Sequence, residues 1–203
     1  MTRRLFYIPV IHAGAELGAA EGVAQLRRVG SDAAHKQAEI ARLWEDVGRW
    51  IESFRDLANV CIYQDGLPVC GQELQIVKDL AHRGSRNHRL LVGMLDRGAK
   101  LVGSEDPDLL LAEYRHIRNA IDQASDAEPA VSNDSSPASD PAELLAARDR
   151  FIADRIAATL GEGQCGVLFI GLLHRVFAYL DPDIVVEFPL IDPRGVHRES
   201  ATG

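Results

Sequence analysis

The sequence predicts a three-layer α/β fold, with a mostly parallel central sheet of about five strands and helices on both faces. Short segments rich in branched aliphatic and aromatic residues alternate with longer segments of helical periodicity. Each short segment is too apolar to face water on either side, which is typical of strands in a parallel sheet. The 203 residues, 46% of them hydrophobic, suit one globular domain over 1–203.

The first two predicted strands lie on either side of a long helix. The first spans Leu5–Ile11, where Pro9 removes one backbone donor and favours an edge position or a bulge. A helical pattern starts at Ser31, and its apolar residues recur every three or four positions, as in an amphipathic helix. These are Ile40, Leu43, Trp44, Val47, Trp50, Ile51 and Phe54. The second strand spans Ala58–Tyr63 and ends before the turn residues Asp65, Gly66 and Pro68.

Two helical segments, over Gln72–His82 and Ser85–Arg97, precede Gly98, which is expected to end the second of them. A short strand over Ala99–Gly103 follows. Asp106 is then placed to cap a helix whose first residue is Pro107.

The last part of the chain resumes the alternation after a polar interruption. Residues 125–140 are rich in Ser, Asp, Ala, Glu and Pro without periodicity, and we expect a mobile surface loop there. A helix over Pro141–Leu160 leads to an apolar strand over Cys165–Ile170 and a short helix that ends near Leu180. The last strand spans Asp183–Phe188, and residues 190–203 are expected to be a frayed tail.

Composition and charge exclude several function classes. The formal net charge of −8 has the wrong sign for a protein that binds the phosphate backbone, so nucleic acid is not an expected partner. Three cysteines without CxxC spacing indicate reduced thiols in a cytoplasmic protein rather than a disulfide framework or a zinc site. The apolar run behind Arg4 is too short for a signal peptide or a membrane span, so no membrane association is expected.

Titratable or coordinating side chains follow the four clearest strands. His12 follows the first, Gln64 and Asp65 the second, Glu105 the third and His174 the fourth. Ligands bind at the carboxyl ends of parallel strands, and imidazole and carboxylate can hold a metal or exchange protons there. Each residue also has a simpler interpretation, because polar residues commonly follow strands as solvated turn residues. Asp65 could, for example, only stabilise the turn at Gly66.

Two further features are open to a functional or a structural interpretation. His88 forms a small basic patch with Arg86 and Arg89 of the kind that can hold an anion. Trp44 and Trp50 lie on one stripe with Phe54, which predicts either core packing or the face of a homodimer.

The strand ends and one helix together resemble the TraB/Tiki superfamily, which includes erythromycin esterases and ChaN-like haem-binding proteins. The run Arg148–Ile156, the strand Val167–Ile170 and the motif Gly171-Leu172-Leu173-His174 resemble the family's C-terminal pattern. Asn59–Asp65 and Ala99–Glu105 resemble its intermediate strands. At the N-terminal motif, Pro9-Val10-Ile11-His12, proline stands where the family has glycine. The resemblance implies peptide cleavage with a metal, ester hydrolysis or haem binding.

Three functional hypotheses follow. In the first, the chain hydrolyses a small-molecule or peptide substrate at a His/carboxylate site. There, Glu105 acts as general base, or a divalent metal (Mn, Zn, Co or Fe) activates water. In the second, the same pocket binds haem, with histidine as the axial ligand. In the third, the chain is a homodimeric interaction module. The predicted catalytic residues are Glu105, Asp65, His12 and His174, the metal ligands His12, His174 and Glu105, and the substrate-binding residues Arg148, Arg150 and Gln64.

Overall fold

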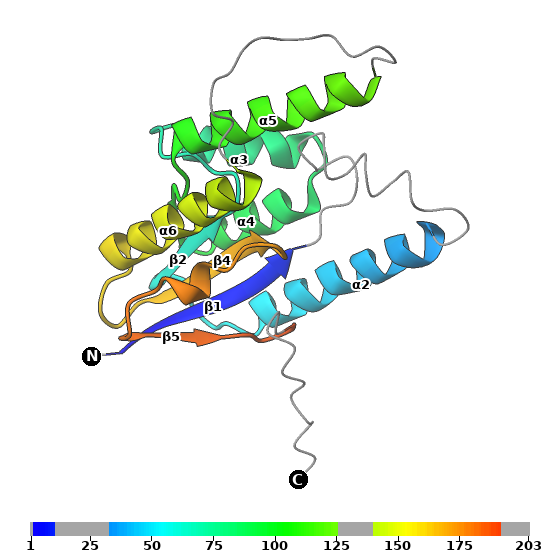
Figure 1. Cartoon of the computed structure of the whole chain (residues 1–203). Coiled ribbons are helices and arrows are strands. Elements are labelled where there is room, and N and C mark those ends of the chain that lie inside the picture. The colour runs from blue at the N-terminus through cyan, green and yellow to red at the C-terminus, as the bar shows by residue number, and fades with distance from the viewer. Residues whose placement is uncertain (1, 11–32, 126–139, 192–203) are drawn as a thin grey trace.

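The computed structural model describes residues 2–10, 33–125 and 140–191 (Figure 1). Most of the predicted loop 125–140 and of the predicted tail 190–203 lies outside the described residues, as does His12.

A five-stranded sheet forms the centre of the protein, and every strand pair in it is parallel. Its strands are β1 (Arg3–Val10), β2 (Val60–Gln64), β3 (Lys100–Val102), β4 (Cys165–Gly171) and β5 (Ile184–Glu187). The order across the sheet is β3-β2-β4-β1-β5, so β4 lies between the first two strands of the chain. The predicted α/β class and the predicted number of strands are therefore confirmed.

Helices cover both faces of the sheet, which confirms the predicted three layers (Figure 1). One face packs against α2, α3 and α4, and the other packs against α6 and the short 3-10 helix η1. Helix α5 packs against α6. The helices are α2 (Ala33–Glu52), α3 (Glu73–His82), α4 (Arg86–Asp96), α5 (Pro107–Ser125), α6 (Pro141–Thr159) and η1 (Val176–Ala178).

Alternation along β1 divides its side chains between two cores. Phe6 and Ile8 join the core under α2 and α4, whereas Leu5 and Tyr7 join the core under α6. The prediction that Pro9 favours an edge position is wrong for β1, which pairs with β4 on one side and β5 on the other. Pairing with β5 ends at Phe6, however, so Pro9 lies beyond the end of that neighbour.

The predicted helix ends are confirmed at two positions. The Asp106 carboxylate accepts hydrogen bonds from the backbone N–H groups of Asp108 and Leu109, which caps α5. Gly98 follows α4 with a φ of 95°, a left-handed conformation that glycine adopts without steric cost.

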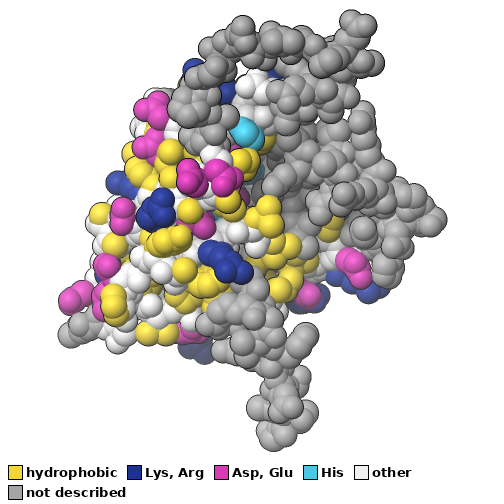
Figure 2. All heavy atoms as spheres, viewed as in Figure 1, with side chains coloured by type: hydrophobic (Ala, Val, Ile, Leu, Met, Phe, Trp, Pro, Cys, Tyr) yellow, Lys and Arg dark blue, Asp and Glu magenta, His cyan; other side chains and the backbone are white. Residues whose placement is uncertain are grey.

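The aromatic stripe of α2 packs on the sheet. Trp44 is buried, and Trp50 and Phe54 make edge-on ring contacts with Phe6 of β1. These contacts explain the aromatic stripe of α2 by packing in the core. The homodimer stays a prediction. On the face shown in Figure 2, hydrophobic, acidic and basic side chains are interspersed rather than gathered by type. Within the described ranges, no helix has the length and apolar character needed to cross a membrane.

Candidate functional site

A buried arginine joins two carboxylates at the edge where the carboxyl ends of the strands meet. Asp65 follows β2, Glu105 follows β3, and Arg148 reaches them from α6. Arg148 Nη2 lies 2.8 Å from Asp65 Oδ1 and 2.6 Å from Glu105 Oε1, while Arg148 Nε donates to Glu105 Oε2 over 3.1 Å. Glu105 is fully buried and Arg148 is 3% exposed, so both charges depend on this pairing for their stability.

Other groups hold the arginine and the carboxylates in place. The backbone N–H of Gly66 donates to Glu105 Oε1 over 3.2 Å, and that of Gly171 donates to Asp65 Oδ2 over 2.9 Å. Glu113 of α5 accepts a hydrogen bond of 2.6 Å from Arg148 Nη1. These contacts hold the carboxylates from several elements of the fold.

A histidine and an aspartate form a second pair beside this cluster. His174 Nδ1 lies 2.6 Å from Asp149 Oδ1, and the other oxygen of Asp149 accepts from the backbone N–H of Arg175 over 2.8 Å. The carbonyl oxygen of His174 accepts a hydrogen bond of 3.0 Å from the Tyr7 hydroxyl. His174 Nε2 lies 3.7 Å from Asp65 Oδ1. This is the arrangement in which a carboxylate orients an imidazole for proton transfer.

The surroundings shift the pKa values of Asp65, Glu105 and His174. Burial alone would raise the pKa of Asp65, but His174 and Arg148 outweigh it and hold that pKa below its usual range. Burial alone would lower the pKa of His174, but Asp149 and Asp65 outweigh it and raise that pKa above 6.5. For Glu105, burial exceeds the effect of Arg148 and raises the pKa. The site thus favours an ionised Asp65 beside a protonated His174.

Gln64 lies on the other face of the sheet from this cluster. Its Oε1 accepts a hydrogen bond of 2.7 Å from Asn87 of α4, and its Nε2 donates to the Asp65 carbonyl over 3.1 Å. Gln64 is 1% exposed, and both ends of its amide have a hydrogen-bond partner within the protein. Asn87 is buried as well, and its Oδ1 has no hydrogen-bond partner among the residues that the structure describes.

The structure brings together four of the residues that the sequence predicts for the site: Asp65, Glu105, Arg148 and His174. It does not add Arg150, which is exposed with its guanidinium 5.6 Å from the Tyr179 ring centre. His12 lies outside the described residues.

Sequence reasoning missed Asp149 and Glu113 as members of the site. A signal for Asp149 does exist in α6. The buried residues of this helix, Leu144, Ile152, Ala153 and Ile156, form an apolar stripe at helical spacing, and Arg148 and Asp149 lie inside it. Charged residues within a buried stripe need partners, which makes them candidates for a site. Glu113 carries no comparable signal in the sequence.

The described donors do not fit a metal ion. Among the residues that the structure describes, no group of three or more His, Cys, Asp or Glu side chains could hold one. Both oxygens of Glu105 accept from Arg148, and Nδ1 of His174 is paired with Asp149. The guanidinium of Arg148 lies between the carboxylates that a divalent cation would need. The predicted ligand set with His12 stays a prediction, as does haem binding.

Comparisons with known proteins add no relative to this description. No protein-family model, no curated protein and no solved structure matches the chain.

Proposed function

We propose that this protein is a hydrolase of small carboxylic esters or amides that uses Asp65 and His174 as a general acid-base pair without a metal. The observation that carries the proposal is the Asp149–His174–Asp65 arrangement, with its contacts of 2.6 and 3.7 Å at the carboxyl end of the central strand. Such a buried, oriented imidazole beside an ionised carboxylate is typical of sites that move protons. The resemblance to the TraB/Tiki superfamily, whose members include esterases, supports the same reaction class.

Each partner has one role in this scheme. Asp65 is ionised and 15% of its side chain is exposed, so it can accept a proton from a water molecule that attacks the substrate carbonyl carbon. His174, whose pKa is raised by Asp149 and Asp65, donates its Nε2 proton to the departing alcohol or amine as the carbonyl–heteroatom bond breaks. Transfer of the proton from Asp65 to His174 then restores the starting state. Arg148 and Glu105 are positioning residues in this scheme.

Two exposed leucines directly precede His174 in the chain. Leu172 and Leu173 are 46% and 64% exposed, directly between β4 and His174. Exposed leucines beside a buried charged cluster favour a substrate whose acyl part is apolar.

The test is a hydrolysis assay with the full chain on p-nitrophenyl acetate, p-nitrophenyl butyrate and amino-acid p-nitroanilides. We expect Asp65→Asn and His174→Gln to lower kcat/KM by about 10²–10⁴-fold, the usual contribution of general acid-base groups. His82→Gln and Asp154→Asn, at exposed positions of α3 and α6, are the matched controls and should keep the wild-type rate.

The same assay separates the proposed reaction from the metal-dependent alternative. Dialysis against EDTA should leave the rate unchanged. A loss that Mn²⁺ or Zn²⁺ restores would replace the proposed mechanism with the metal-dependent one. Hydrolysis of no substrate by folded wild-type protein, or wild-type rates in both site variants, would contradict the proposal.

A further inference from the structure

A buried tyrosine of β1 contacts the backbone of His174. Strand β1 pairs in parallel with β4, and the side chain of Tyr7 lies in the core under α6. The Tyr7 hydroxyl donates a hydrogen bond of 3.0 Å to the carbonyl oxygen of His174, three residues after the end of β4. Tyr7 is 1% exposed, so this hydrogen bond lies inside the protein.

Other elements of the fold hold both ends of the peptide unit between His174 and Arg175. Tyr7 of β1 binds its carbonyl oxygen, and Asp149 of α6 accepts a hydrogen bond of 2.8 Å from its N–H. The other oxygen of Asp149 lies 2.6 Å from Nδ1 of the His174 ring. Because a peptide unit is planar, fixing its carbonyl also fixes the direction of its N–H. The Tyr7 hydroxyl therefore helps to keep this N–H, and with it the ring, on the Asp149 carboxylate.

The Tyr7 ring is held independently of its hydroxyl. Its centre lies 5.6 Å from that of Phe177, edge-on, and 5.3 Å from that of Phe188, in a tilted contact. Phe177 belongs to η1, and Phe188 follows β5. Phenylalanine at position 7 would keep both ring contacts, so the effect of the hydroxyl can be separated from that of the ring.

The Tyr7 hydroxyl stays a donor in neutral solution. Burial raises the pKa of its phenol above the usual value of about 10, and the carboxylates of Asp149 and Asp65 raise it further. The phenol therefore keeps its proton, and the hydrogen bond to His174 is present under the conditions of a hydrolysis assay.

We infer that Tyr7 is a positioning residue, which acts through the His174 carbonyl to keep the imidazole on Asp149 and 3.7 Å from Asp65. Its role in the reaction rests on the proposed function. The placement of the imidazole, in contrast, is a property of the protein without substrate, so it can be measured separately.

Proton NMR of the full chain, labelled with ¹⁵N-histidine and without substrate, tests this placement. An imidazole proton in a short hydrogen bond to a carboxylate resonates far downfield of other imidazole protons, and its absence from His174→Gln identifies it. In Tyr7→Phe we expect this resonance to lose its wild-type position. In the hydrolysis assay, the same variant should lower kcat by about 3- to 10-fold, the range of one net hydrogen bond, with KM changed less than about twofold.

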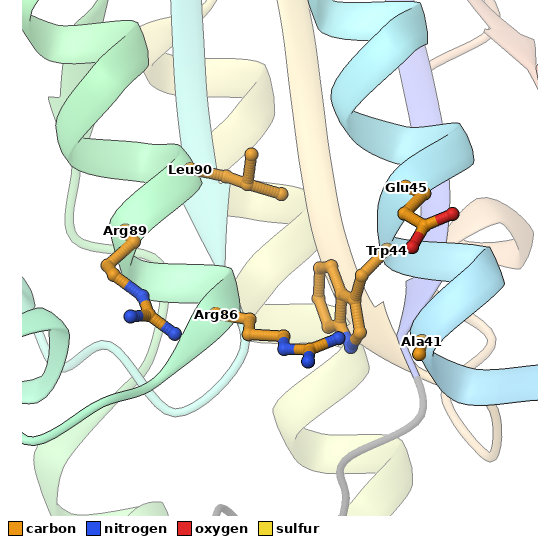
Figure 3. A pocket seen from close by; sticks show the side chains of 6 residues that line it. All are labelled: Ala41, Trp44, Glu45, Arg86, Arg89 and Leu90. Carbon is orange, nitrogen blue, oxygen red and sulfur yellow. The ribbon is translucent and has the colours of Figure 1, made fainter. Parts of the chain in front are cut away.

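Two controls change the core at other places. Tyr63→Phe removes the hydroxyl of a second fully buried tyrosine, which lies 2.9 Å from Thr159 Oγ1. Thr159 is ten residues along α6 from Asp149, about 15 Å at the rise of an α-helix. Trp44→Phe changes the core on the opposite face of the sheet, beside the surface depression between α2 and α4 that Figure 3 shows. Both variants should keep the His174 resonance and the wild-type kcat.

A third variant restores the donor. Replacing Tyr7 by p-aminophenylalanine keeps the ring and supplies an N–H in place of the O–H, so the resonance and kcat should stay at their wild-type values even if Tyr7→Phe does not fold. An unchanged resonance or kcat in Tyr7→Phe, an equal change in Tyr63→Phe, or a lost resonance in the p-aminophenylalanine variant would overturn the inference. Absence of hydrolysis by the wild-type protein would instead contradict the proposed function, because the resonance is measured without substrate.

Discussion

Replacing Arg148 by methionine removes the cation that three carboxylates share. Methionine has a similar length, so the main change is the loss of charge and of the four hydrogen bonds from the guanidinium. Because Glu105 is fully buried, its carboxylate would be left with the Gly66 N–H and no counter-charge. Breaking a buried ion pair on one side typically costs about 3–5 kcal/mol of unfolding free energy, and we expect a loss in this range.

A second substitution separates the loss of pairing from a general loss of packing. Changing Glu105 to leucine in the Arg148→Met background removes the stranded charge as well. Asp65 and Glu113 then remain, and their side chains are 15% and 36% exposed, so water stabilises them partly. The double variant should therefore regain about 1–3 kcal/mol relative to the single variant, because replacing both partners of a buried pair is far less costly than replacing one.

The measurement is urea unfolding at pH 7 followed by circular dichroism. Arg150→Met, at an exposed neighbouring position of α6, is the control and should change the unfolding free energy by less than about 1 kcal/mol. A loss below about 1 kcal/mol in Arg148→Met, or a double variant no more stable than the single one, would refute the view that Arg148 neutralises Glu105.

Three other predictions concern separate parts of the fold. The pKa of His174 in the folded protein is raised above 6.5. The protonated side chain therefore makes its full contribution to folding stability below pH 6.5, and this contribution is lost as the pH rises through the folded pKa. The difference in urea unfolding free energy between wild type and Asp149→Asn should therefore be larger at pH 6 than at pH 9; a constant difference would be inconsistent with this pairing. Gly103→Ala should lower the unfolding free energy by about 1–3 kcal/mol, because the new Cβ would lie 3.0 Å from backbone atoms. In Gly93→Ala of α4 the new Cβ meets nothing within 4 Å, so the unfolding free energy should rise by up to about 1 kcal/mol. Ser85→Ala removes the side chain that caps α4, and its thermal midpoint should fall by an amount that corresponds to about 1 kcal/mol; an unchanged midpoint would show that the cap contributes little.

The elements could be predicted from the sequence because local chemistry determines them. Short apolar runs bounded by turn residues, such as Cys165–Ile170, are typical of buried strands, and Gly98 and Asp106 mark helix ends through their own backbone or side-chain preferences. Strand order depends on long-range packing, so the position of β4 between β1 and β2 could not be read from any local pattern.

The site could be predicted in part for the same reason. Residues at strand ends converge on one edge of a parallel sheet, and Asp65, Glu105 and His174 follow that rule. Gln64 is at a strand end as well, but the alternation of side chains turns it to the opposite face, toward Asn87. Asp149 comes from a helix, so the strand-end rule could not find it.

The position of β4 has a consequence for how the chain is made. Since β4 lies between β1 and β2, a nascent chain that ends before Cys165 holds two central strands with no partner between them. Strands that are far apart in the sequence pair slowly, and apolar strands that are still unpaired favour aggregation. Synthesis of β4 and the residues that follow it therefore completes the centre of the sheet and brings His174 to Asp65. Fragments that stop short of β4 should need a chaperone to stay in solution.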